Sequence, residues 1–269
     1  DGQNVIQTAY HILVASSPEL LEQGKGDIWD SGKIESDASQ WIAYQGKTLK
    51  RNAPYYWKVK IDTNKGTTDW STPAFWTTGL FNEADWQGQW IGLDKAAPGD
   101  SETQWSRLAA RYLRKEFALK KEVKRATVHI AGMGLYELFI NGQRIGNQVL
   151  APAPTDYRKT LLYNTYDVTS LLQTENAIGV ILGNGRFYTM RQNYKPYKIP
   201  TFGYPKLRLN LIVEYADGSK ETIATNTSWK LTTEGPIRSN NEYDGEEYDA
   251  RKELGDWTQT GYDLSLIHI

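Results

Sequence analysis

The sequence predicts an all-β protein built from two β-sandwich domains, with a boundary near residue 80. The first observation is that apolar and polar residues alternate with a period of two along most of the chain. The second is that short strands recur about every ten residues with turn residues between them, a spacing typical of sandwiches. The third is a content of 10 Trp and 17 Tyr, because aromatic residues favour strands.

The first domain is expected over residues 1–80. Pro54 opens its clearest strand, residues 55–62, in which apolar side chains alternate with Tyr and Lys. Asn64-Lys65-Gly66 is a turn into a return strand at residues 70–78. Further strands are expected at residues 8–15, 28–34 and 41–44. The first strand of this sandwich is expected to lie ahead of Asp1, so we interpret the domain as truncated there.

The second domain is expected over residues 81–262, with a linker at residues 79–83. Its first strands are expected at residues 111–117, 126–130 and 135–140. Asn141-Gly142 is a type I′ turn signal that folds the next residues back, and Asp217-Gly218 predicts a second hairpin. Asp167 is expected to cap one helical turn at residues 168–172. Residues 263–269 are interpreted as a tail or a cloning remnant.

Composition excludes several classes of function. Lys and Arg number 31 against 32 Asp and Glu, so the chain lacks the basic excess that nucleic-acid binding needs. No apolar run approaches the roughly 18 residues of a membrane span. The absence of Cys excludes disulfide scaffolds, thiol catalysis and Cys-built metal sites. The start at Asp1, without Met or a signal-peptide pattern, is interpreted as the start of an excised piece.

The most acidic segment, residues 242–251, does not predict a catalytic site. Glycoside hydrolysis needs two carboxyl groups that flank the scissile bond. Adjacent carboxylates on a strand point to opposite faces, so this segment is interpreted as an edge strand in which Asp249 or Arg251 pairs with a neighbour. His11 and His129 each lie inside an apolar strand and are interpreted as hydrogen-bonded strand residues. No catalytic constellation emerges from the sequence.

The loop at residues 183–188 permits two interpretations. Glycines on both sides of Asn184 allow a positive φ and a close approach to a ligand, and the Asn amide can bind a diol or offer its carbonyl oxygen to Ca²⁺. The alternative is a tight turn built from residues that turns prefer. The Gly-x-Gly spacing lacks the rest of a dinucleotide fingerprint, so phosphate binding is not expected.

Ordered motifs along nearly the whole chain resemble the N-terminal region of bacterial α-L-rhamnosidases of glycoside hydrolase family 78. Residues 7–16, 29–33 and 56–59 resemble that family's fibronectin type III-like (immunoglobulin-like) sandwich. The rest of the chain resembles the N-terminal β-jelly-roll domain of the same family, at residues 90–92, 110–117, 134–142, 149–152, 155–157, 163–169, 182–185 and 245–251. The resemblance implies an inverting hydrolase of terminal α-L-rhamnose whose catalytic (α/α)₆ barrel lies outside this chain.

The resemblance also implies candidate site residues. Some members bind L-rhamnose together with Ca²⁺ through Asp and Asn side chains near Gly-Asn-Gly, which points to Asn184 and, more weakly, Asn147 as sugar or calcium ligands. Arg186 and Tyr188 would add hydrogen bonds and a stacking face. Asn147-Gln148 stands where calcium-binding members are expected to carry Asp, and one charge fewer weakens a calcium site.

We therefore expect the non-catalytic N-terminal part of an α-L-rhamnosidase, inactive alone. Its implied partners are L-rhamnose-containing glycans of plants and the C-terminal catalytic barrel, with no nucleic acid and no membrane. The alternatives are a free-standing rhamnose-binding module and a β-sandwich scaffold or adhesion protein that binds no sugar. Export to the periplasm or medium is what the resemblance implies, since polysaccharide-degrading enzymes of this type usually act there.

Overall fold

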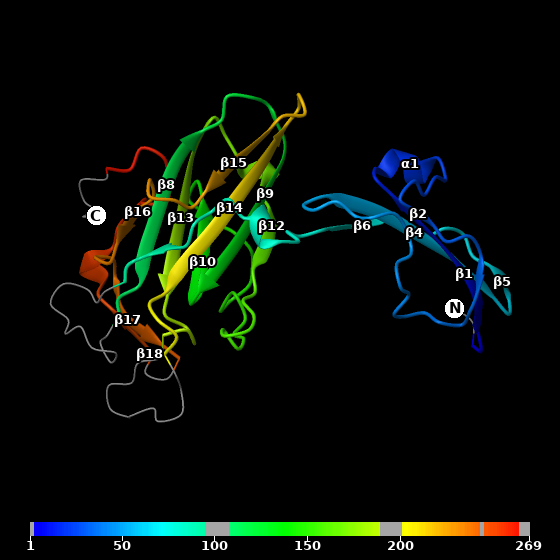
Figure 1. Ribbon diagram of the computed structural model, residues 1–269, viewed down its shortest axis with the longest axis horizontal. Coiled ribbons are helices and arrows are strands. Elements are labelled where there is room, and N and C mark those ends of the chain that lie inside the picture. The colour runs from blue at the N-terminus through cyan, green and yellow to red at the C-terminus, as the bar shows by residue number, and fades with distance from the viewer. Residues whose placement is uncertain (1–2, 95–107, 189–200, 243–244, 264–269) are drawn as a thin grey trace. The chain divides into compact units, whose positions relative to one another are not determined.

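The computed structural model describes residues 3–94, 108–188, 201–242 and 245–263 (Figure 1). The chain divides into two compact units, Asp1–Glu83 (unit 1) and Ala84–Ile269 (unit 2). Nearly all regular elements are strands, which confirms the predicted all-β class. Among the described residues, no helix is both long and apolar enough to cross a membrane. Most of the predicted C-terminal tail, residues 264–269, lies outside the described residues.

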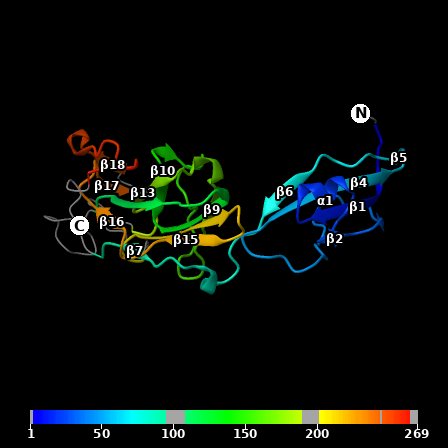
Figure 2. The ribbon, with the colours of Figure 1, turned by 90° about the horizontal axis from the view of Figure 1, so that it is seen from above.

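Unit 1 contains one antiparallel sheet in the order β2-β1-β4-β5, with β3 also paired to β1 and β6 to β4. Its short helix α1 lies against β1 and β4 (Figure 2). Ser17 begins this helix by accepting a hydrogen bond from Leu20 N. The elements are β1 (Gln7–Ala15), α1 (Pro18–Glu22), β2 (Trp29–Asp30), β3 (Ile34–Glu35), β4 (Pro54–Thr63), β5 (Gly66–Thr67) and β6 (Ala74–Thr77).

The strand predicted at residues 41–44 is wrong. This segment carries no strand, and Trp41 adopts a left-handed φ of 59° with its side chain 96% exposed. A bulky residue in that conformation interrupts an extended run, so the aromatic propensity that predicted a strand is overridden. The return strand is also shorter than predicted, because only Ala74–Thr77 pairs with β4.

Unit 2 contains two five-stranded antiparallel sheets, β11-β10-β13-β8-β16 and β12-β9-β14-β15 with β7 paired to β14. Figure 2 shows β10 and β13 in one layer, with β9 and β15 in the other. A separate hairpin joins β17 and β18. The strands are β7 (Ile91–Gly92), β8 (Arg111–Ala118), β9 (Val123–Met133), β10 (Leu135–Ile140), β11 (Gln143–Arg144), β12 (Asn164–Asp167), β13 (Glu175–Gly183), β14 (Lys206–Tyr215), β15 (Lys220–Ala224), β16 (Lys230–Thr232), β17 (Ile237–Asn241) and β18 (Gly245–Tyr248). Three short 3₁₀ turns occur at Glu83–Asp85, Thr169–Leu171 and Ala250–Lys252.

Alternation along the long strands builds the core of unit 2. Alternate residues of β14 from Leu207 to Val213 are fully buried, and β9, β10 and β13 contribute their own alternating sets. Fully burying one such aliphatic side chain contributes about 1.5–3 kcal/mol. The periodicity seen in the sequence is therefore the pattern that holds the two sheets together.

The predicted turns are confirmed. Asn141 and Gly142 both have positive φ, 49° and 81°, and they pair Phe139 with Arg144 across the hairpin. The second hairpin forms at Asp217-Gly218, where Asp217 Oδ1 accepts from Ser219 N at 2.9 Å. The helical turn after β12 is a 3₁₀ turn over Thr169–Leu171, and its N-cap residue is Val168 rather than the predicted Asp167, although Asp167 Oδ1 accepts from Thr169 N at 2.9 Å.

Two extended segments cover the outer faces of the unit 2 sandwich. On β14, the fully buried Asn210 amide donates to Asp85 O at 3.1 Å and accepts from Gly88 N at 2.8 Å. On β8, the buried Arg114 guanidinium donates to Trp257 O at 2.6 Å and also to Gln259 O. Asn210 thus fixes residues 85–88 to one outer face of the sandwich, and Arg114 fixes residues 257–259 to the other.

The strand histidines are hydrogen-bonded, as predicted. His11 Nε2 lies 2.6 Å from Asp30 Oδ1 in unit 1, and His129 Nδ1 lies 3.0 Å from Thr165 Oγ1 in unit 2. Burial, together with the smaller effect of the nearby Arg125 charge, lowers the pKa of His129 to about 4. The neutral imidazole is therefore the form that the folded protein contains at pH 7.

This pKa makes the stability of unit 2 depend on pH. His129 binds its proton near pH 6.5 when unfolded and near 4 when folded, so its contribution is complete above pH 6.5 and is lost as the pH falls towards 4. We expect the stability difference between the wild type and the His129→Gln variant to shrink by about 3 kcal/mol from pH 7 to pH 4. Urea unfolding at both pH values measures it, and a constant difference would contradict the assignment.

Candidate functional site

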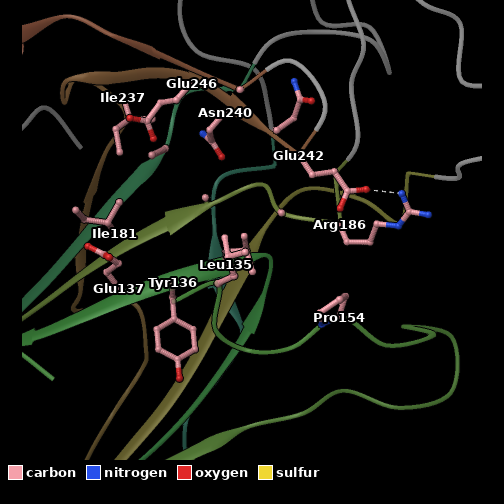
Figure 3. A pocket seen from close by; sticks show the side chains of 16 residues that line it. Leu135, Tyr136, Glu137, Pro154, Ile181, Arg186, Ile237, Asn240, Glu242 and Glu246 are labelled. Atoms are coloured by element: carbon pink, nitrogen blue, oxygen red, sulfur yellow. Dashed lines mark hydrogen bonds and ion pairs between the residues drawn. The ribbon is translucent and has the colours of Figure 1, made fainter. Parts of the chain in front are cut away.

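A cavity of about 710 Å³ lies on the outer side of β10 and β13, beside the β17–β18 hairpin and the loop that follows β13 (Figure 3). Strand alternation places Glu137 and Ile181 on this side, since the two residues are register partners. The apolar lining residues are Ala110, Leu135, Leu150, Pro154, Ile181 and Ile237, and the polar ones include Glu137, Arg186, Asn240, Asn241, Glu242 and Glu246. The cavity thus combines an apolar floor with a polar rim.

The glycines around Asn184 are required by close packing. A Cβ on Gly183 would lie 2.9 Å from Asn240 Oδ1. Gly185 has a φ of 49°, and a Cβ there would lie 2.7 Å from the Leu135 side chain. The positive φ predicted for this loop is present at Gly185, and the close neighbour there is Leu135 of the protein itself, so the predicted close approach to a ligand stays a prediction.

Asn184 is 2% exposed and connects three segments of unit 2. Its Nδ2 donates to Asn240 O at 2.7 Å and to Leu108 O at 3.1 Å, while its backbone N donates to Asn240 Oδ1 at 2.7 Å. Its Oδ1 is buried and has no hydrogen-bond partner among the described residues. Asn184 is not itself a lining residue of the cavity; it fixes β17 against the end of β13, between the lining residues Gly183 and Gly185.

Arg186 lies at the rim of the cavity, where its guanidinium pairs with Glu242 at 2.5 Å (Figure 3). The two side chains are 33% and 37% exposed, so both remain accessible to a ligand. A second arginine, Arg144, pairs with Glu137 at 3.2 Å. The charged groups at the cavity are therefore partly hydrated, and two of its carboxylates, Glu137 and Glu242, are paired with arginines.

The predicted site residues Tyr188 and Asn147 also lie outside the cavity lining. Tyr188 is 2% exposed, its ring stacks on Tyr204 at 5.9 Å, and it packs against Leu108. Asn147 lies in the exposed turn after β11, in the same turn as the lining residue Leu150. Of the four predicted site residues, the structure thus places Arg186 in the cavity lining, whereas Asn184 holds the lining residue Asn240 and Asn147 and Tyr188 lie outside the lining.

The acidic segment is largely as predicted. β18 is an exposed strand at the edge of its hairpin, and Asp249 pairs with Arg251 at 2.8 Å. That arginine holds the pKa of Asp249 down at about 2.

Sequence reasoning missed the cavity carboxylates Glu137, Glu242 and Glu246. The alternation of β10 offered a local signal for Glu137, whereas the placement of the other two depends on the β17–β18 hairpin.

The described residues do not make a calcium site. Ca²⁺ takes six to eight oxygen ligands, usually with several carboxylates. The buried Oδ1 of Asn184 is one suitable oxygen, but in the described part of the chain no three His, Cys, Asp or Glu side chains gather into a metal-binding group. We therefore derive no role for a metal from these residues.

Residues 121–268 match the family model of the alpha-L-rhamnosidase N-terminal domain. The chain belongs to this family. Residues 1–82 match a second model, the Rha78A-like N-terminal immunoglobulin domain. An α-L-rhamnosidase of Formosa agariphila is 41% identical over 285 residues, which cover 98% of this chain and 30% of that protein.

Solved α-L-rhamnosidase structures agree. That of Dictyoglumus thermophilum is 41% identical with a TM-score of 0.87, and that of Aspergillus terreus is 33% identical with a TM-score of 0.83. The alignments cover 99% and 98% of this chain, and 30% of each solved chain. This rhamnosidase N-terminal chain thus spans about 30% of the length of these relatives.

The contacts of Asn184 predict a structural role for its side chain. We expect Asn184→Ala to destabilise unit 2 by about 2 kcal/mol, because Asn240 O loses the Nδ2 donor and Leu108 O keeps only the longer 3.4 Å bond from Asn240 Nδ2. Arg186→Ala is the matched control, since removing half of an exposed ion pair changes stability by less than about 1 kcal/mol. Urea unfolding and hydrogen exchange of β17 compare the two, and equal stabilities would refute this role.

Proposed function

We propose that this chain is the non-catalytic N-terminal region of an α-L-rhamnosidase, and that the unit 2 cavity is its carbohydrate-binding surface. The observation that carries the proposal is the cavity itself, where Arg186 and the Asn240 amide edge an apolar floor beside the Gly-Asn-Gly loop. Its volume of about 710 Å³ is typical of small-molecule sites. The relatives' much greater length supports a catalytic (α/α)₆ barrel elsewhere in the protein as the partner of this region.

The chemistry of the lining favours a neutral deoxysugar. Leu135 and Ile181 offer an apolar surface to a methyl group, and amides and carboxylates can bind hydroxyl groups. Glu137 and Glu242 already occupy the two arginines at the cavity, Arg144 and Arg186, and Glu246 adds a further negative charge, so like-charge repulsion disfavours a uronate. L-rhamnose, a neutral 6-deoxyhexose, has the chemistry that fits. Asn184 acts in this proposal by holding Asn240 in place.

Calorimetric titration tests this function. We expect L-rhamnose to bind and D-galacturonate not to bind, and we expect Arg186→Ala to weaken rhamnose binding at least tenfold through loss of a charged hydrogen-bond donor. Arg158→Ala is the matched control, since Arg158 pairs with Asp156 and does not line the cavity. Titrations with added Ca²⁺ and with EDTA show whether a metal contributes. No binding in any condition would refute the sugar site.

A second candidate function is a docking surface for the catalytic barrel. Val149 and Leu150 are 78% and 71% exposed beside the cavity, and Leu150 has a left-handed φ of 57°. Exposed apolar side chains held in an uncommon backbone conformation are typical of interfaces. A flat sugar titration, together with destabilisation of the full-length enzyme by Val149→Ser, would favour docking over sugar binding.

A further inference from the structure

A small pocket of about 210 Å³ lies on the face of the unit 1 sheet that α1 covers further along. Its lining residues are Tyr10, His11, Lys33, Lys60, Asp62 and Thr67. His11 pairs with Lys60 across β1 and β4. Asp62, two residues further along β4, pairs with Thr67 of β5. Because side chains alternate along a strand, these four share one face of the sheet, so the paired strands position the pocket.

One ammonium group of this pocket has no counter-charge. Lys33 is already neutralised, because its Nζ lies 2.7 Å from Asp62 Oδ2 and 3.0 Å from Glu35 Oε1. A third carboxylate, that of Asp30, contacts the histidine of the pocket at 2.6 Å. Lys60 forms no ion pair within the part of the chain that the structure describes. Its positive charge is therefore one that a bound anion can neutralise.

The Trp70 ring holds this ammonium group in place. Lys60 Nζ and Lys58 Nζ each lie 5.1 Å from the centroid of the ring, and His11 meets the ring edge to face at 5.0 Å. Lys58 is buried, and its ammonium donates to Leu21 O rather than to a carboxylate. The cation–π contact restricts the Lys60 side chain, and the second ammonium beside the same ring adds to the positive potential there.

We propose that this pocket binds one tetrahedral oxyanion, the sulfate or phosphate group of a free ion or of a sugar ester. An ammonium group is a point charge with three N–H donors, which suits a tetrahedral group. A planar carboxylate is best matched by the fork of arginine, and the lining has none. The pocket is smaller than the roughly 300–1,000 Å³ of sites for larger ligands, so it fits one such group rather than a glycan chain.

The donors of the two lysines and the charge of Asp62 decide how tightly the anion is held. Lys60 contributes up to three N–H donors, and Lys33 has one left after those that its two carboxylates accept. Asp62 opposes binding, because like charges repel across a small pocket. The affinity is therefore modest and responds in opposite directions to removal of Lys60 and of Asp62.

Nuclear magnetic resonance titration of the chain tests the proposal. At constant ionic strength, we expect inorganic sulfate and phosphate to shift the amide signals of β4 saturably, and acetate to bind at least about fivefold more weakly. Lys60→Gln should weaken sulfate binding by about tenfold through loss of a charged donor. Lys65→Gln is the matched control, since it removes the same charge in the exposed turn after β4, outside the lining. Asp62→Asn should strengthen binding.

Sugar esters identify the source of the anion. If glucose 6-sulfate or glucose 6-phosphate binds more tightly than its free ion, the site belongs to that ester, and equal or weaker binding assigns it to the free ion. An unsaturable response to sulfate would overturn the proposal, as would equal binding of acetate or equal weakening by Lys60→Gln and Lys65→Gln. Arg186→Ala should leave sulfate binding unchanged, so this site stands or fails independently of sugar binding in unit 2.

Discussion

The buried Arg114 guanidinium is the contact on which the outer face of unit 2 depends. It donates to the carbonyl groups of Trp257 and Gln259 and pairs with Glu116, so a charge inside the protein has partners on three sides. Trp257 can then lie directly on Gly179, where a Cβ would come within 3.0 Å of its ring. The candidate cavity lies on the same outer face, beside the area that residues 257–259 cover.

The boundary of that cavity is set by a reciprocal contact between Asn184 and Asn240. Each residue donates or accepts through both its side chain and its backbone, which makes the pair geometrically specific. Gly183 is a consequence of this contact, because a Cβ there would lie 2.9 Å from Asn240 Oδ1, whereas Gly185 is required by its packing on Leu135. A rigid wall of this kind keeps an open, partly charged cavity from collapsing.

The sequence allowed the local features to be predicted and not the long-range ones. Strand alternation and the Asn141-Gly142 turn are encoded within a few neighbouring residues, so both were foreseen. Asn184 was singled out for its Gly-rich surroundings, but its partner Asn240 lies 56 residues away and could not be foreseen. At Trp41 the local signal itself failed, since the left-handed backbone there opposes the strand preference of aromatic residues.

Two open surfaces, one in each unit, differ in charge. In unit 1, the groove between β1, β4 and segment 38–49 has no charged lining residue, so covering it buries only apolar and weakly polar groups and is favourable throughout. The unit 2 cavity has Arg186 and three carboxylates in its lining, and permanent burial would remove their hydration. A small polar ligand that exchanges with water therefore suits the unit 2 cavity.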